Sequence, residues 1–382
     1  MNRMLILSLA LLAAACASTS GPPRRTLVPG ETQILRVPDG AEVPGPEVVD
    51  AIRDMRVVYV GEMHNNDFHH DFQLEVVKSL FAQDHRLMIG MEMFQRPAQA
   101  ALDEFVFGNI DEAELLRRSE YFSRWGWDYR YYREILLFAK RNGIPLVALN
   151  APTEVRRKVG KSGIESLTPG ERTQIAEEID TTIEDHRAFL KEIFDAHPMG
   201  NRKFEHFYEA QCVWEDTMAE SVALALEARP DHRMVVLVGG GHVQRRYGIP
   251  VRAERRGAEP YSILLGTIDG DHLDEYLVGD YADWLVITPR APKEPPTPRL
   301  RVRIEAGEGG EGVFVKSVMD GSLADLAGLK AGDRILSANG TTITSPEDVR
   351  IFVTLNEEPK GTIRVFRDGQ QRTLQYDTRW RR

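Results

Sequence analysis

Four acidic and imidazole side chains stand just past apolar runs of the sequence. Glu62 and His64 follow the run that begins at Val57, and an extended chain would point both side chains the same way. Glu92 ends a second apolar run, and His242 follows three consecutive glycines. A carboxylate beside an imidazole can hold a divalent metal or act as a general acid–base pair. These four residues are therefore candidate metal ligands or candidate acid–base residues.

The segments that must position these residues are predicted strands. Nearly continuous apolar runs, most of them followed by a helical pattern, occur at 57–60, 86–92, 144–150, 234–238, 261–268 and 284–288. Such runs are typical of strands buried on both faces, so we predict an α/β domain with a mostly parallel sheet flanked by helices. The carboxyl ends of parallel strands meet at one edge, where ligands bind. The four residues are therefore expected to share that edge.

The stretch at residues 122–132 is dense in aromatic side chains. It contains Trp125, Trp127, Tyr129, Tyr131 and Tyr132. One interpretation is the start of a helix packed on the core, which composition alone favours. The other is an aromatic wall for a flat ligand, with a tyrosine hydroxyl that ligates ferric iron.

Residues 154–201 are strongly charged and helical in pattern, with breaks at 160–163 and 168–170. We interpret this segment as a helical insertion over the sheet edge that could act as a lid. A long helix is predicted at 204–227 from apolar residues at helical spacing. Gln211 is the polar exception on that apolar face, so it is expected to find a partner there.

Residues 1–15 have the pattern of a signal peptide, with a charged start, an apolar stretch and three alanines. Cys16 follows directly, as in bacterial lipoproteins, whose cysteine carries palmitate or a similar acyl chain. The alternative is an ordinary secretory signal that happens to precede a cysteine. On the lipoprotein interpretation, residues 16–30 are a tether and the protein is anchored in the cell envelope. Ala17 favours the outer membrane.

A proline-rich segment divides the rest of the chain into two predicted domains, and the net charge bears on the class of partner. Residues 289–298 contain five prolines, which is typical of a stiff linker between a domain at 31–288 and another at 299–382. The net charge of −10 argues against nucleic acid as a partner. The second cysteine, Cys212, is expected to be a small core residue.

The motifs between about 57 and 250 resemble, in order, those of the ChaN-type haem-binding lipoproteins. They are Gly61-Glu-Met-His64, His69-His70 with Gln73, Glu92-Met-Phe94, the aromatic stretch 125–132, Ala148-Leu-Asn150 and Gly239-Gly-Gly-His242. The resemblance implies an α/β fold that binds haem, with roles in haem and iron uptake. It also implies a tyrosine ligand, with Tyr129, Tyr131 and Tyr132 as candidates and Tyr208 behind them, and haem held between two protomers of a homodimer.

The same resemblance keeps a hydrolase open as an alternative. The family belongs to a wider superfamily that includes Tiki-type proteases and erythromycin esterases, and it shares two Gly-x-x-His motifs, here Gly61–His64 and Gly239–His242. In that case Glu62, His64, Glu92 and His242 would be catalytic, around a divalent metal. Whether the protein is an enzyme is therefore left undecided by the sequence.

The tail resembles a PDZ domain of the bacterial protease-associated type, which implies a small α+β fold. The motifs are Gly312-Val-Phe-Val315, Gly321-Ser-Leu-Ala324, Ala331-Gly-Asp-Arg-Ile335 and Ser345-Pro-Glu-Asp-Val349. PDZ domains bind an extended protein segment or peptide by adding it to a sheet edge. Arg301 stands where the family often has glycine, which argues against capture of a free C-terminus but not against strand addition.

Overall fold

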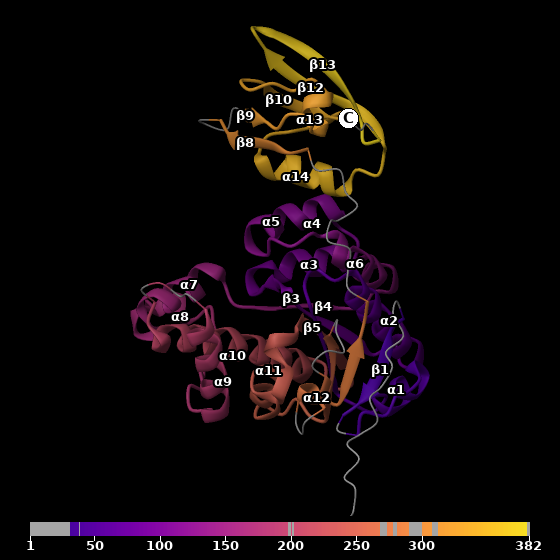
Figure 1. Cartoon of the computed structure of the whole chain (residues 1–382), viewed down its shortest axis with the longest axis vertical. Helices are drawn as coiled ribbons and strands as arrows, with labels where there is room; N and C mark the ends of the chain where they lie inside the picture. Colours follow the sequence, from indigo (N-terminus) through magenta and orange to yellow (C-terminus); the bar gives the residue numbers. More distant parts are fainter. Residues whose placement is uncertain are drawn as a thin grey trace, which may run out of the picture.

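The computed structural model describes residues 31–379, except 38, 198–199, 201, 268–272, 278–280, 290–299 and 308–311. The predicted signal peptide, the tether with Cys16, and residues 290–298 of the predicted linker lie outside the described residues. The described chain forms two sheets, each with its own helices (Figure 1). Within these ranges, no helix is long and apolar enough to cross a membrane.

The larger sheet has seven strands in the order β1-β7-β6-β2-β5-β3-β4. They are β1 (Gln33–Arg36), β2 (Val57–Glu62), β3 (Leu87–Gln95), β4 (Leu146–Asn150), β5 (Arg233–Gly239), β6 (Tyr261–Thr267) and β7 (Trp284–Ile287). β1 pairs antiparallel with β7, and the other neighbouring pairs are parallel. The predicted mostly parallel sheet is confirmed, with β1 as an added edge strand that the sequence analysis did not predict.

Helices cover both faces of this sheet, as the alternation within β2 shows. Val58 and Val60 belong to one hydrophobic cluster with α1 (Gly45–Ala51), α2 (Asp67–Gln83), α3 (Gln99–Val106), α4 (Glu112–Arg118) and α6 (Arg130–Asn142). Val57 and Tyr59 belong to a second cluster with α10 (Phe204–Ala228) and α11 (Ile249–Glu254). Since strand side chains alternate between faces, both faces of β2 need apolar residues, which explains its unbroken apolar run.

The predicted helical insertion is present between β4 and α10. It consists of α7 (Thr153–Ser162), α8 (Pro169–Arg172) and α9 (Glu184–Ala196), which Figure 1 shows at one side of the sheet. Val155 and Val159 of α7 pack with Val213 of α10. Leu190 of α9 packs with Tyr208 and Cys212 of the same long helix. The insertion is therefore held by α10, and Cys212 is the buried core residue that was expected.

The smaller sheet is antiparallel, in the order β13-β12-β10-β9-β8 with β11 paired to β10. Its elements are β8 (Val302–Ala306), β9 (Val313–Val318), α13 (Leu323–Leu326), β10 (Arg334–Ala338), β11 (Thr341–Thr342), α14 (Pro346–Leu355), β12 (Lys360–Arg367) and β13 (Gln370–Asp377). A capping box between Ser345 and Asp348 starts α14. The predicted small α+β fold is confirmed.

The two parts touch through α14, which lies beside α4 (Figure 1). Ile351 of α14 is buried in the hydrophobic cluster of the larger part. Two ion pairs flank this contact, from Arg117 to Asp348 at 3.1 Å and from Arg133 to Glu357 at 2.7 Å. The contact therefore combines a buried apolar side chain with charged pairs at its rim.

Candidate functional site

The strand ends bring the four predicted polar residues to one edge of the larger sheet. Glu62 ends β2 and lies in register with Gly239, the last residue of β5. The chain then makes a 3-10 turn that ends at His242. Glu92 lies on the neighbouring strand β3, which runs three residues further than Glu92 and so places it within the strand. The predicted convergence of these side chains is present.

Glu62 holds His64 in one orientation. The two side chains bond at 2.6 Å between Oε1 and Nδ1, and the Tyr132 hydroxyl donates to the same oxygen at 3.2 Å. The second carboxylate oxygen is 4.0 Å from Nε2 of His70. Burial acts to lower the pKa of His64, but the bond to Glu62 and the charges of Glu62 and Glu92 together outweigh it and the pKa is raised. The ring is thus favoured as an imidazolium.

Glu92 and His242 form the second pair. The Gly239 N–H donates to Oε2 of Glu92 at 2.7 Å, and Oε1 lies 3.4 Å from Nε2 of His242. Nδ1 of His242 bonds to Glu215 at 3.2 Å. Burial would lower the pKa of His242, but Glu92 and Glu215 raise it to about 10. Both ring nitrogens are already engaged with carboxylates.

A buried charge network extends this pair into the insertion. The other oxygen of Glu215 is 3.2 Å from Nε2 of His186 and 3.5 Å from Nε of Arg252. Arg252 is fully buried and bonds to Asp216 at 2.8 Å. Burial would raise the pKa of Glu215, but His186 and His242 hold it well below its usual value. The network links β3, α9, α10 and α11.

Sequence reasoning missed most of this network. The sequence analysis did not single out His186, and it chose Gln211 as the polar residue on the buried face of α10. The structure corrects both: His186 is buried, Gln211 is only partly buried, and the buried acids of α10 are Glu215 and Asp216. Cys212 and Ala219 lie on that same face, three or four residues from the two acids. This helical spacing could have predicted that Glu215 and Asp216 are buried.

Two glycines allow the chain to pass close to the histidines at this edge of the larger sheet. A Cβ at Gly239 would lie 2.9 Å from Cε1 of His64 and 3.5 Å from Oε2 of Glu92, so this glycine is where the two Glu–His pairs meet. A Cβ at Gly248 would lie 2.3 Å from the His242 carbonyl oxygen. The chain can approach both histidines closely only because these positions carry no side chain.

The metal alternative is not supported by this arrangement. Each imidazole pairs with carboxylates, and in the ranges that the structure describes no three His, Cys, Asp or Glu side chains are grouped to hold a metal ion. The hydrolase alternative is not favoured either. His242 is buried, with Nδ1 bonded to Glu215 and Nε2 at 3.4 Å from Glu92, so its proton is held by the chain's own carboxylates.

An exposed aromatic surface adjoins the first Glu–His pair. Met63 and Trp127 are large apolar side chains with 40% and 39% of their surface exposed. The Trp127 ring is 5.4 Å from the His64 ring, and the Trp125 ring is 4.9 Å from it. We call Met63, His64, Trp125 and Trp127 the His64 patch. Exposed apolar side chains gathered around a polar group are a feature of ligand-binding surfaces.

Comparison with known families decides the class of this domain. The model described as "Haem-binding uptake, Tiki superfamily, ChaN" matches residues 48–253, which is more than half of the chain. The chain belongs to the ChaN family. A PDZ domain model matches residues 314–357, within the smaller sheet.

The fold agrees with a solved member of the ChaN family. The structure titled "Cofacial heme binding to ChaN of Campylobacter jejuni" superposes with a TM-score of 0.53, covers 67% of this chain and 96% of that chain, and has 15% sequence identity. At this identity the likeness shows the fold alone.

Two curated proteins match parts of the chain. Protein RETICULATA-RELATED 5, chloroplastic, from Arabidopsis thaliana is 25% identical over 245 residues, which are 59% of this chain and 33% of that protein. Serine protease Do-like HtrB from Bacillus subtilis is 40% identical over 67 residues, which are 17% of this chain and 15% of that protein. The chain therefore spans a third or less of these relatives.

The four tyrosines predicted as haem ligands occupy different environments in this ChaN-family domain. Tyr129, Tyr132 and Tyr208 are buried, and their hydroxyls donate to Glu112, Glu62 and the Ile183 carbonyl, respectively. Burial raises the pKa of each of these phenols. Tyr131 is only partly buried, and its ring stacks on His70 at 5.0 Å.

This donor set fits haem. A haem has a broad apolar face and takes imidazole, thiolate, thioether or phenolate as axial ligand. The His64 patch offers exposed apolar surface, and Tyr131 offers a partly exposed phenol near it. His70 connects the two, since it stacks on Tyr131 and its Nε2 lies 3.3 Å from the His64 carbonyl oxygen.

The aromatic stretch also borders a cavity of the PDZ domain, with a volume of about 560 Å³. One wall comes from β8 and the residues before it, and another from α14. The third wall belongs to the larger part and consists of Phe122, Gly126, Trp127 and Asp128. Arg301, at the entrance to β8, has φ +52°, in the left-handed region that favours glycine. This agrees with its position where related domains often have glycine.

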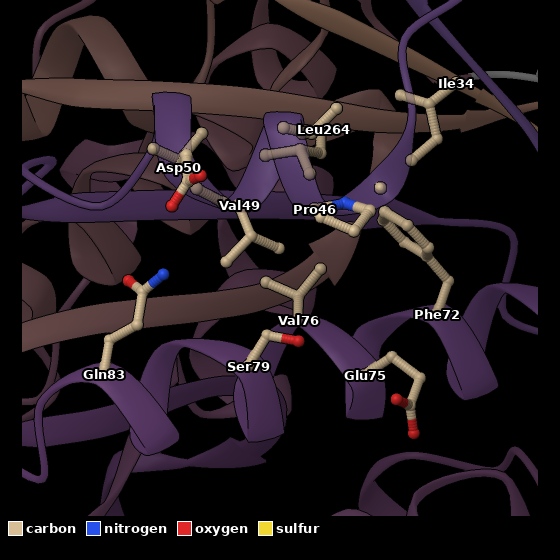
Figure 2. A pocket seen from close by; sticks show the side chains of 13 residues that line it. Ile34, Pro46, Val49, Asp50, Phe72, Glu75, Val76, Ser79, Gln83 and Leu264 are labelled. Carbon is tan, nitrogen blue, oxygen red and sulfur yellow. The ribbon is translucent and has the colours of Figure 1, made fainter.

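A separate apolar cavity of about 470 Å³ lies between α1 and α2 (Figure 2). Val49 and Phe72 point into it, while Asp50 and Glu75 lie at its sides. None of the residues of the Glu–His pairs lines it. It therefore has no part in the site at the sheet edge.

Proposed function

We propose that this protein binds haem on the His64 patch, with Tyr131 as the iron ligand. The observation that carries the proposal is the exposure of Trp127 beside an imidazole that Glu62 holds in place, with the neighbouring residue Met63 also exposed. Tyr131 is favoured because it is only partly buried, whereas the three other candidate tyrosines are buried. His70 would orient the Tyr131 ring by stacking on it.

Residues of the His64 patch and Glu62 would contribute to haem binding in different ways. Met63 and Trp127 would lose exposed apolar surface to the flat face of the ligand, which is the main favourable contribution. Glu62 would keep His64 from turning into the space that the ligand needs. Haem would be cargo of this protein, in keeping with a role in haem and iron uptake.

The test is a titration of the purified chain with ferric haem, followed by absorption spectroscopy. Tyr131→Phe is expected to lose the spectrum of tyrosine-ligated haem, because phenylalanine keeps the ring and removes only the oxygen. Tyr129→Phe and Tyr132→Phe are the matched controls and should keep it. A parent protein without specific haem binding, or an unchanged spectrum for Tyr131→Phe, would refute the proposal. Sedimentation with and without haem tests whether a second copy completes the site.

We also propose that the protein is a lipoprotein anchored in the bacterial cell envelope through Cys16. The support is the segment at 1–15, whose small residues run directly into a cysteine. Cys16→Ala is expected to move the protein from the membrane fraction to the soluble fraction. Cys212→Ala, the other cysteine, should leave it in the membrane fraction. Equal membrane association of both variants would contradict lipid anchoring.

The third part of the proposal concerns the PDZ domain. We propose that an extended peptide adds to β8 and fills the cavity between β8 and α14. Val353→Asp would place a charge on the partly buried wall of this cavity, where the peptide side chains would lie, and it should abolish binding of a selected peptide. Arg372→Ala, on the exposed strand β13, serves as the control. Peptide binding that survives Val353→Asp would place the interaction elsewhere.

A further inference from the structure

A large cavity between α7 and the start of α10 carries a concentration of positive charge. Its volume is about 930 Å³. Its basic lining residues are Arg156, Arg157, Lys161, Arg202, Lys203 and His206, and none of the residues that line it is acidic. The whole chain has a net charge of −10, so this collection of cations contrasts with the rest of the molecule.

The Lys and Arg side chains of this cavity form no close ion pair within the described ranges, although the Glu92 carboxylate acts on Arg156 from a greater distance. Lys158, on the same helix α7, pairs with Glu171 at 2.6 Å, which shows that ion pairs form where an acid is near. No such pair involves the five Lys and Arg side chains of the cavity among the residues that the structure describes. Like charges held close together repel, and an anion placed between them removes that cost.

Two residues that line the cavity, Arg156 and Trp214, carry buried nitrogen atoms without acceptors in the part of the chain that the structure describes. The Arg156 guanidinium lies 3.5 Å from the centre of the Trp214 ring. Nε of Arg156 and Nε1 of Trp214 are both buried, and neither has a hydrogen-bond partner among the described residues. Both groups can only donate. Burial lowers the pKa of Arg156 to about 10, the Glu92 carboxylate acts in the opposite direction, and a bound anionic oxygen would add to the effect of Glu92.

The remaining walls are apolar. Phe207 and Trp214 lie one above the other along α10, seven residues apart. Gly160 and Ala210 let α7 and α10 approach at the floor, since a Cβ on Gly160 would lie 3.6 Å from that of Ala210. The opposite side of Trp214 touches His242, with ring centres 4.6 Å apart. The cavity shares no residue with the His64 patch, and it backs on the buried charge network.

We propose that this cavity is a binding site for a small organic anion with at least two carboxylate or phosphate groups. Two groups are required because the cations stand on two walls, Arg157 and Lys161 on α7 and Lys203 just before α10. The body of the ligand lies against Phe207 and Trp214, and one anionic oxygen accepts from Arg156. This site is separate from the proposed haem site and does not depend on it.

The test uses calorimetry on the full chain with two probes, pyrophosphate for the phosphate class and citrate for the carboxylate class. Arg157→Gln with Lys161→Gln is expected to weaken binding of the effective probe by about tenfold or more, because two charge-assisted contacts are lost. The control is Lys330→Gln with Arg372→Gln, two exposed residues of the PDZ domain that give the same change of charge. The control should bind like the parent.

A second measurement, tryptophan fluorescence, tests whether the ligand lies against Trp214 in the cavity. Binding is expected to change the tryptophan fluorescence of the parent, and Trp214→Phe should remove that change while leaving the chain folded. The proposal is overturned if neither probe binds at millimolar concentration, or if the Arg157/Lys161 variant binds as tightly as the parent. If the Arg157/Lys161 variant also fails to bind haem, the cavity is not a site separate from the haem site. Loss of haem binding in Tyr131→Phe alone bears only on the haem proposal.

Discussion

The charge on His242 is expected to stabilise the folded chain, and His242→Gln measures by how much. The imidazole lies between Glu92 at 3.4 Å and Glu215 at 3.2 Å, and these carboxylates raise its pKa from 6.5 to about 10. Each pKa unit corresponds to about 1.4 kcal/mol, so the raised pKa corresponds to about 5 kcal/mol of stability. Removing one partner of a buried ion pair costs about 3–5 kcal/mol, which agrees.

The sign of the pH dependence follows from the raised pKa. A histidine whose folded pKa exceeds its unfolded pKa contributes fully below the unfolded value and loses its contribution as the pH rises to the folded value. The window therefore runs from about pH 6.5 to about pH 10. The difference in unfolding free energy between the parent and His242→Gln should be largest near pH 6 and should shrink towards pH 10.

Urea unfolding followed by circular dichroism, at several pH values across that window, is the assay. His85→Gln, which removes an exposed histidine, is the control and should change the unfolding free energy little at any pH. A pH-independent difference for His242→Gln would refute the reasoning. So would a difference that grows with pH, because it would mean that the folded protein holds a neutral imidazole.

Two further predictions follow from the close contacts. Gly248→Ala should destabilise the fold by roughly 1–3 kcal/mol in urea unfolding, because its Cβ would lie 2.3 Å from the His242 carbonyl oxygen. Gly170→Ala, with nothing near the added Cβ, is the control, and equal effects would contradict the packing argument. Deleting 299–382 should leave a cooperative thermal transition for the larger part, lowered by a few degrees because burial of Ile351 contributes about 1.5–3 kcal/mol. Loss of the transition would show that the two parts fold only together.

The fold was largely predictable because its strands are buried on both faces. The runs that begin at Val57 and Met234 are apolar throughout, and no other structure accounts for them as simply. β1 was missed because it is short, lies at the edge of the sheet and ends in the exposed Arg36. A four-residue edge strand leaves little pattern in a sequence.

The site was predictable only in part. Glu62 and His242 could be placed because strand ends fix the positions of the residues that follow them. Glu215 and Arg252 could not, since each lies on a helix whose rotation depends on packing, and a charged residue there is normally expected to face solvent. The hydroxyl directions of Tyr129 and Tyr132 depend in the same way on how α6 is turned.

Trp127 belongs to two surfaces at once. It stands beside His64 at the aromatic patch, and it forms part of the wall of the cavity between β8 and α14. A peptide in that cavity and a ligand on the patch would therefore share one indole. Thermodynamic linkage requires that each would change the affinity of the other by the same factor, whether the effect is favourable or not. Peptide binding by the PDZ domain would then depend on whether a ligand occupies the His64 patch.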